Sequence, residues 1–273
     1  MDLILFSNDD DASLNILNNL KNLVNFEYLG KFENNEYYKF NKFYVIIIDQ
    51  EKVRAENIDI KIKNSLSINF ENIIVASKHR SESGMRSLTV HPIGNFGRAD
   101  LGGKDKTLVS VNANYMTGAL LKLNEIGKDI NYNISYEATH HGPYLSTPTF
   151  FIEIGSNYEE WNDQNSGKII AETIIKTEKT NDEIAIGIGG GHYTPRFTKL
   201  ALTKKISFGH MAPKYAAEKI DLEMLLQMKE KCNAKYLIME KKDLSGKERK
   251  RIEDLLDQAG LELIDSDSLP DRP

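Results

Sequence analysis

The stretch IAIGIGGGHYTPR, residues 184–196, is the most informative part of the sequence for the fold. It joins an apolar run, Ile184–Ile188, to three glycines and then to Thr194-Pro195, a pair that favours the start of a helix. A strand that passes through a glycine turn into a helix is a basic unit of α/β proteins. Glycines also let the backbone come close to a ligand and present bare N–H groups. The stretch predicts an α/β fold with a loop at Gly189–Gly191 suited to a phosphate or an oxyanion.

Similar apolar runs alternate with amphipathic segments along most of the chain. The expected strands are Leu3–Phe6, Phe43–Ile48, Ile73–Ala76, Ile134–Tyr136, Phe150–Ile154, Ile184–Ile188, Tyr236–Met239 and Leu261–Ile264. The expected helices are Ala12–Leu23, Met116–Ile126, Tyr158–Lys176, Lys219–Lys231 and Lys247–Ala259. This alternation predicts a largely parallel or mixed sheet covered by helices. Residues 33–66 contain strand-like pieces without a clear helix, and they form either an antiparallel edge or a small insertion.

Length and composition predict one compact domain over residues 1–273. A chain of 273 residues can bury a full core, and its 40% hydrophobic and 27% charged residues are ordinary for a globular protein. Cys232 is the only cysteine, which excludes an intrachain disulfide. The N-terminal residues do not resemble a secretion signal, and the longest apolar run is too short for a membrane helix. We therefore expect a cytoplasmic protein with no membrane partner.

The charge of the chain restricts its partners. A net charge of −5 argues against general coating of nucleic acid, so no DNA partner is expected. Local basic clusters can still bind RNA phosphates on an acidic protein. A solvated surface mixed with acids explains each cluster more simply when it is taken alone. The clusters are Lys104 with Lys106, Lys204-Lys205, and Lys247 with Arg249-Lys250-Arg251.

Histidines gather where the predicted strands end. Five of the six lie in such loops or just past a strand, namely His79, His140, His141, His192 and His210. Ligands of open α/β sheets bind beyond the carboxyl ends of the strands, so these loops are expected to form one polar cleft. The sixth, His91, directly precedes Pro92 and is expected to influence loop shape more than chemistry.

Glu137-Ala138-Thr139-His140-His141 is a candidate for proton transfer or metal binding. Histidine titrates near neutral pH and is a common zinc ligand, and Glu137 would complete a histidine–carboxylate set. Both imidazoles can converge if the preceding strand ends by Thr139. The spacing matches no recognised zinc motif, and a structural histidine pair is the alternative. Ser77-Lys78-His79-Arg80 suits a phosphate or a ribose, with an exposed loop as its alternative.

Several longer strings resemble one known family, the archaeal and plant (type 2) D-aminoacyl-tRNA deacylases. They are SKHRSESG (77–84), LTVHPIGN (88–95), EATHHGPY (137–144), EIGSNYEEW (153–161), GIGGGHYTPRFT (187–198) and FGHMAPKY (208–215). The resemblance runs over nearly the whole chain. It implies a three-layer α/β/α sandwich with a mixed central sheet, similar to peptidyl-tRNA hydrolases and nucleoside phosphorylases. It also implies a monomeric, zinc-dependent enzyme.

The activity that the resemblance implies is hydrolysis of the ester bond of D-aminoacyl-tRNA, a quality-control step of translation that releases D-amino acid and tRNA. The partner would be the acceptor end of the tRNA. Two other functions remain open: a hydrolase similar to peptidyl-tRNA hydrolases or zinc exopeptidases, and a non-catalytic module that binds tRNA or nucleotides.

Roles for the site residues follow as hypotheses. His140 or His141, with Glu137, would activate water directly or through zinc, and the amides of the glycine loop would hold the oxyanion. His79, Arg80 and Arg196 would bind the terminal adenosine and its phosphate. The expected catalytic residues are His79, Glu137, His140, His141 and His192. The expected substrate-binding residues are Ser77, Arg80, Gly189, Gly190, Gly191, Arg196 and His210, and the expected zinc ligands are Glu137, His140 and His141.

Overall fold

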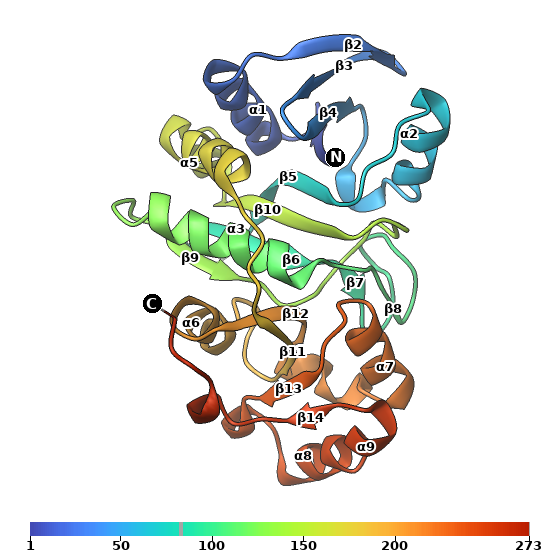
Figure 1. Ribbon diagram of the computed structural model, residues 1–273, viewed down its shortest axis with the longest axis vertical. Coiled ribbons are helices and arrows are strands. Elements are labelled where there is room, and N and C mark those ends of the chain that lie inside the picture. The colour runs from blue at the N-terminus through green and yellow to red at the C-terminus, as the bar shows by residue number, and fades with distance from the viewer. Residues whose placement is uncertain (82–83, 273) are drawn as a thin grey trace.

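The computed structural model describes residues 1–81 and 84–272, so Glu82 and Ser83 of the string SKHRSESG lie outside the described residues. Its strands form two main sheets that lie one above the other in Figure 1, with the N-terminal half of the chain around the upper sheet. None of the helices in the described residues combines the length and apolar character needed to cross a bilayer.

The larger sheet has eight strands in the described residues, in the order β2-β3-β4-β1-β5-β10-β6-β9. Strands β1, β4, β5 and β10 are parallel, whereas β6 and β9 run in the opposite direction. The expected mixed sheet is therefore confirmed. Its strands are β1 (Asp2–Ser7), β2 (Glu27–Phe32), β3 (Asn35–Phe40), β4 (Phe43–Ile48), β5 (Ile73–Arg80), β6 (Ser87–Pro92), β9 (Asn133–Tyr136) and β10 (Thr149–Ser156).

A second sheet, which the sequence did not lead us to expect, has four parallel strands in the order β12-β11-β13-β14. They are β11 (Glu183–Ile188), β12 (Ile206–Ala212), β13 (Tyr236–Met239) and β14 (Glu262–Leu263). Two short antiparallel strands, β7 (Gly94–Asn95) and β8 (Thr107–Leu108), make a separate ribbon. The two sheets are separate because no ladder joins β9 to β12 among the described residues.

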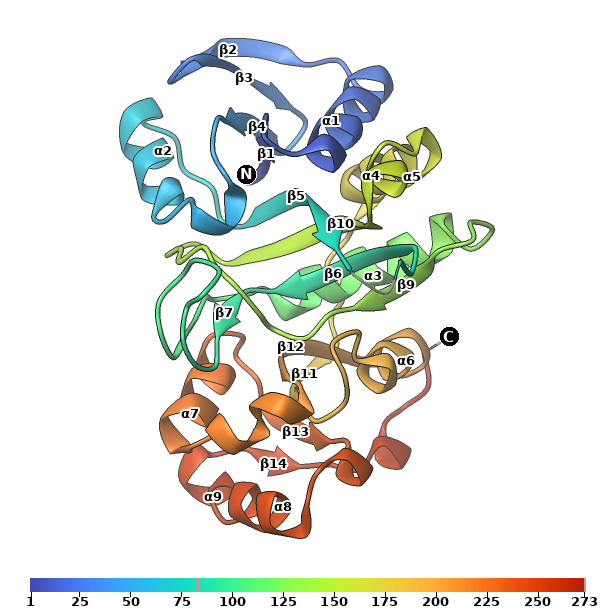
Figure 2. The same ribbon diagram turned by 180° about the vertical axis from the view of Figure 1, so that it is seen from behind.

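Helices cover both faces of the larger sheet (Figure 2). On one face α1 packs on β5, α3 on β6 and α5 on β10. On the other face Ile58 and Ile62 of α2 join Leu5 and Val75 in a second core. The helices are α1 (Asp11–Leu23), α2 (Ile58–Leu66), α3 (Ala113–Ile126), α4 (Tyr158–Trp161), α5 (Gln164–Lys176), α6 (Pro195–Thr203), α7 (Leu222–Glu230), α8 (Gly246–Glu253) and α9 (Leu256–Ala259), with 3₁₀ turns η1 (Lys52–Arg54), η2 (Lys214–Lys219), η3 (Lys241–Asp243) and η4 (Ser266–Ser268).

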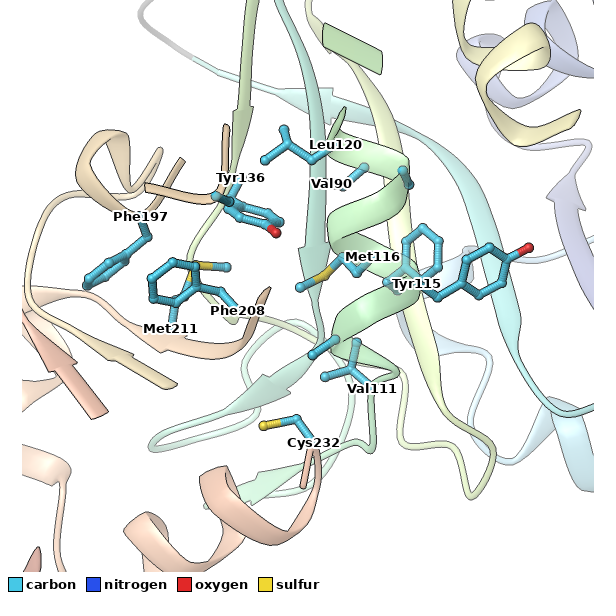
Figure 3. Packing of buried hydrophobic residues seen from close by; sticks show 14 of the residues in the cluster. Val90, Val111, Tyr115, Met116, Leu120, Tyr136, Phe197, Phe208, Met211 and Cys232 are labelled. Carbon is cyan, nitrogen blue, oxygen red and sulfur yellow. The ribbon is translucent and has the colours of Figure 1, made fainter. Parts of the chain in front are cut away.

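Helix α3 lies between the two sheets and contacts both β6 and β12. In Figure 3, Met116 of α3 points toward Phe208 and Met211 of β12, with Tyr136 of β9 beside them. These side chains belong to one hydrophobic cluster that continues into the smaller sheet. A shared core of this kind supports our proposal that residues 1–273 form a single unit.

The eight expected strands all form, with ends that differ by a few residues. Residues 33–66 make an antiparallel edge, in which β3 pairs with β2 and β4, but they also contain α2. Two expected helices are each divided into two. The first division follows α4, where Asp163 accepts a hydrogen bond from the Asn165 amide and caps a new helix, α5.

Candidate active site

The histidines gather on one face of the larger sheet, around Glu153 in the middle of β10. Glu153 lies opposite Ser77 of β5 and Thr89 of β6, so His79 and His91, each two residues further along, project on the same face. Both imidazoles lean toward Glu153 Oε2, with His79 Nδ1 at 3.6 Å and His91 Nε2 at 3.5 Å. Four of the histidines expected to share a polar cleft do converge, namely His79, His140, His141 and His192. They do not meet at a common carboxyl edge, because β5 and β9 run in opposite directions.

Glu137 is a second buried carboxylate in the cluster, and it comes directly after β9. Its Oε2 lies 3.0 Å from His192 Nε2, 3.3 Å from His79 Nδ1 and 3.6 Å from His140 Nε2. Its Oε1 has no hydrogen-bond partner among the described residues. A fully buried carboxylate is retained only where cations, protons or hydrogen bonds compensate it, so this site is built for positive charge.

Three imidazoles form a separate group beside the carboxylates. The ring centroids of His91 and His140 are 4.3 Å apart, and those of His140 and His141 are 4.4 Å apart. Each Nδ1 lies beside a carbonyl oxygen: Pro92 O at 3.1 Å, Ala138 O at 2.7 Å and Gly142 O at 2.5 Å, respectively. Because a carbonyl only accepts, each Nδ1 carries a proton. The Nε2 of His140 and His141 therefore keeps its lone pair, whereas the Nε2 of His91 faces the Glu153 carboxylate and carries a proton when it donates to it.

Strand β9 ends at Tyr136, before Thr139. The chain then turns, which allows His140 and His141 to converge as expected. His141 takes a left-handed conformation with φ 46°, uncommon for a residue with a side chain and typical of functional sites. Backbone hydrogen bonds join this segment to the smaller sheet, since the Ala138 amide donates to His192 O and the Thr139 amide to Met211 O. These bonds bring His192 to Glu137.

Burial and charge divide the histidines into two classes. For His140 and His141, burial and then the charge of His91 lower the pKa, to about 4 for His141 and well below the ordinary value for His140. Burial also opposes charge on His79 and His91, but the hydrogen bond and charge of Glu153, with the charge of Glu137, outweigh it and raise the pKa of both.

The pKa values of the two buried carboxylates are lowered, although burial by itself would raise them. Burial alone would raise the pKa of Glu137 and of Glu153, but neighbouring imidazoles reverse this effect. The hydrogen bond with His192 is the largest lowering influence on the pKa of Glu137. For Glu153, hydrogen bonds with His79 and His91 hold the pKa well below its usual range. Both side chains therefore stay ionised at neutral pH.

The glycine loop reaches the cluster through His192, although its local structure differs from our expectation. Gly189 has φ 108°, and its amide already donates to Ala212 O, so it cannot hold an oxyanion. An added Cβ there would lie 3.0 Å from Glu240, whereas one on Gly191 would meet open space. Helix α6 does begin at Pro195, but Thr194 has φ 38° and makes no capping hydrogen bond through its side chain.

Two expected substrate-binding residues are too buried to contact a substrate. The Ser77 hydroxyl donates to Asp10 Oδ2 at 3.3 Å, within a buried group that also contains Lys52. His210 is fully buried inside β12, where its Nδ1 lies 3.2 Å from Thr139 Oγ1. Burial lowers the pKa of His210 to about 3, which keeps the imidazole neutral. Both residues therefore have structural roles in the buried layer next to the site.

Two expected phosphate ligands lie away from the imidazoles. Because side chains alternate along β5, Arg80 projects on the face opposite His79, as does Lys78, whose amine lies over the Trp161 ring. Arg196 donates to Ser266 Oγ at 3.1 Å and lines a separate cavity of about 130 Å³. Lys241, Lys242 and Asp265 also line that cavity. The structure thus does not bring Arg80, Arg196 and His79 together as one adenosine site.

The cluster contains three sets of side chains that could hold a metal ion. They are His91 with His140 and His141, His79 with Glu137 and His192, and His91 with Glu137 and Glu153. The donor atoms in each set lie within 4.8 Å of one another. The expected ligands Glu137, His140 and His141 all take part, although they are divided between sets. His140 and His141 share their set with His91, for which the sequence had predicted an effect on loop shape.

Three residues of the cluster were not among the expected site residues. His91 and Glu153 lie inside strands, and Tyr193 places its hydroxyl 3.1 Å from His79 Nε2. The signal for Glu153 was present, since a carboxylate within the apolar run Phe150–Ile154 must be compensated when that strand is buried. We find no comparable signal for Tyr193.

Comparison with known proteins gives a consistent result at three levels. A family model described as D-aminoacyl-tRNA deacylase matches residues 66–264. The D-aminoacyl-tRNA deacylase of Pyrococcus abyssi is 38% identical over 97% of this chain and 99% of its own, and that of Archaeoglobus fulgidus is 35% identical over 97% and 96%. The crystal structure of a conserved protein of unknown function superposes with a TM-score of 0.92 at 34% identity, covering 99% of this chain and 98% of that one.

Proposed function

The chain belongs to the D-aminoacyl-tRNA deacylase family, and we propose that its histidine–carboxylate cluster hydrolyses the ester bond of D-aminoacyl-tRNA in translation quality control. The observation that carries the assignment to this cluster is the convergence of four imidazoles on two buried carboxylates, with a fifth imidazole, that of His141, packed against His140. A module that only binds tRNA has little use for such a costly polar core. Activity therefore explains the cluster better than binding alone.

We propose zinc as the cofactor, because the donor set fits it. Imidazole nitrogens and carboxylate oxygens are the usual ligands of catalytic zinc, and each of three histidines has its Nδ1–H fixed by a carbonyl. This leaves Nε2 of each ring to bind an ion, for His91 once the proton that it shares with Glu153 is lost. The unpaired Glu137 Oε1 in a buried site also favours a cation. His91, His140 and His141 would hold one ion, and His79, Glu137 and His192 form a second candidate set. Bound zinc would acidify water and polarise the ester carbonyl.

The reaction needs a proton acceptor beside the attacking water. His192 suits this role because its side chain is 32% exposed while its Nε2 contacts Glu137, so a substrate can reach an imidazole that is held by a carboxylate. Water would attack the carbonyl carbon, its proton would pass to His192, and the bond from the carbonyl carbon to the ribose oxygen would break. That oxygen would then take the proton as the tRNA hydroxyl forms. The amides of Gly190 and Gly191 remain our candidates for the oxyanion.

The decisive experiment compares the two hands of one substrate. Purified protein is expected to release tyrosine from D-Tyr-tRNA and to leave L-Tyr-tRNA largely intact. Assays with N-blocked aminoacyl-tRNA and with free peptides test the peptidyl-tRNA hydrolase and exopeptidase alternatives. Equal rates on both hands, or preferential cleavage of a blocked substrate or a peptide, would overturn the proposal. Binding of tRNA without any release would favour the non-catalytic module.

We also propose that the enzyme is a monomer that acts in the cytoplasm on the acceptor end of tRNA. The continuous core across both sheets supports a single folded unit, and aminoacyl-tRNA is used where translation takes place. Light scattering of the purified protein at working concentration tests the oligomeric state.

A further inference from the structure

The histidine cluster opens to solvent through a cavity of about 260 Å³ beside Tyr215. His140 and His141 form its inner wall, and Arg98, Tyr215 and Lys219 lie at its rim. Tyr215 is 60% exposed although it is a large aromatic residue on the short turn η2. An aromatic ring displayed at the mouth of a reactive site is suited to a flat ligand.

A larger cavity of about 600 Å³ continues outward from this mouth. The two cavities share Phe96, Gly97, Arg98 and Lys219, so they form one groove. The Lys219 amine lies against Gly97, where an added Cβ would be only 2.9 Å from Nζ. The Lys219 amine therefore lies over Gly97, a residue that lines both cavities. Lys106 adds a further cation to the outer part.

Four carboxylates also line the groove beside its three cations, and some of them have local partners. The carboxylates are those of Asp100, Asp105, Glu218 and Asp221. Asp105 accepts the Ala99 amide, and Asp221 accepts the Met224 amide as the N-cap of α7. Arg98 and Asp100 pair at 3.6 Å with both side chains largely exposed, an arrangement that contributes little in water and is easily exchanged for a phosphate. The groove therefore combines an aromatic platform with cations that remain able to bind an anion.

We propose that Tyr215 stacks on the base of the 3′-terminal nucleotide of tRNA and that Arg98 and Lys219 bind the phosphate that precedes it. This inference rests on the proposed function, because the ester bond lies one ribose away from that base. Proteins bind single-stranded nucleic acid by stacking bases on aromatic side chains and by binding phosphates with cations. An exposed ring and two cations line the cavity that also contains His140 and His141. The single-stranded 3′ end of the tRNA would lie along the groove and would not pass Arg196.

Substitution of Tyr215 tests the stacking. Tyr215→Ala is expected to raise the inhibition constant of the trinucleotide CCA, and the KM for D-Tyr-tRNA, by about tenfold or more, since stacking on an aromatic ring contributes roughly that factor. Tyr215→Phe keeps the ring face and is expected to stay within about threefold of the wild type. Unchanged kcat and metal content in both variants would exclude a general disturbance of the site. Equal effects of Ala and Phe would overturn the proposal.

The chemical identity of the contact is tested with a second substrate. If Tyr215 contacts the base, the loss caused by Tyr215→Ala is the same for D-Tyr-tRNA and D-Ala-tRNA; a loss confined to D-Tyr-tRNA would assign the ring to the amino-acid side chain instead. Binding of CCA by the wild type is measured without turnover. Failure of the wild type to deacylate would therefore count against the proposed function, whereas unchanged CCA affinity in Tyr215→Ala would count against this inference.

Charge reversal tests the phosphate contact. Lys219→Glu is expected to weaken CCA binding and to flatten its dependence on salt, because a lost phosphate contact releases fewer counterions. Lys250→Glu on α8 is the matched control and should leave both unchanged. Arg196→Glu separates the two routes, since an effect as large as that of Lys219→Glu would place the strand beside the Arg196 cavity and overturn the groove assignment.

Discussion

Replacement of His91 by asparagine is the sharpest test of the site, because the sequence and the structure assign this residue different roles. Its position before Pro92 suggested an effect on loop shape. In the structure its ring is fully buried, 4.3 Å from that of His140 and 5.1 Å from that of His141. The variant His91→Asn removes an Nε2 donor but retains a polar side chain. We expect it to impair metal binding and turnover rather than folding.

The size of the effect follows from sharing the binding energy of zinc among its ligands. Zinc sites with four protein ligands bind with about 10–16 kcal/mol, so an equal share is roughly 2.5–4 kcal/mol per ligand. Loss of one ligand should then raise the Kd for zinc by about two to three orders of magnitude. Turnover at limiting zinc should fall by a similar factor.

The assay measures zinc per chain after competition with a chelator, together with turnover of D-Tyr-tRNA. His210→Asn is the matched control, because His210 is equally buried but lies behind the cluster. We expect that variant to be less stable while it keeps its zinc. If His91→Asn retains zinc and turnover within about threefold of the wild type, or if His210→Asn loses both equally, the three-histidine site is wrong.

Two further predictions concern stability. The pKa of His210 is about 3 in the folded protein against an ordinary 6.5, so below pH 6.5 the unfolded chain binds a proton that the folded chain does not. The free energy of unfolding should fall as the pH drops from 6.5 toward 3, and denaturant titrations should show a shallower fall for His210→Asn; parallel curves would contradict this. Gly189→Ala should lower the free energy of unfolding by about 1–2 kcal/mol or more, because φ is 108° and Glu240 leaves no room for a Cβ. Gly191→Ala, which meets open space, should change it by less than about 0.5 kcal/mol, and similar losses in both variants would be evidence against this description of the loop.

Local patterns in the sequence predicted most strands, but they could not predict strand direction. Runs such as Ile73–Ala76 and Phe150–Ile154 are apolar because both faces of their strands are buried. An apolar run can be recognised without knowing which strands pair with it. Whether β6 runs parallel or antiparallel to β10 depends on the connections between them. The expectation of a carboxyl-edge site assumed that β9 runs parallel to β5, but β9 follows the direction of β6. The antiparallel β6 moves the site to the face of the sheet.

His91 was misjudged for a related reason. Ser87–Pro92 alternates between apolar and polar residues and ends in proline, a pattern that indicates an exposed or edge strand. In the structure this strand lies between β10 and β9. Its polar residues Ser87, Thr89 and His91 face the active site, and Leu88 and Val90 face the core. The same alternation describes a solvent face and a functional face, so the sequence alone cannot separate them.

The glycine loop has a structural role that its composition did not suggest. The string that begins at Glu137 follows a strand of the larger sheet, whereas the strings 187–198 and 208–215 belong to the smaller sheet. The Ala138–His192 and Thr139–Met211 backbone hydrogen bonds join them. Glu137 then collects imidazoles from β5, from its own segment and from the glycine loop of the smaller sheet. Neither sheet alone provides a complete set of donors around this carboxylate. A buried carboxylate that is compensated only across an interface makes correct docking of the two sheets a condition for a stable site. The need for close backbone approach at Gly189 and Gly190, beside Glu240, therefore has as much to do with holding His192 in place as with binding a substrate.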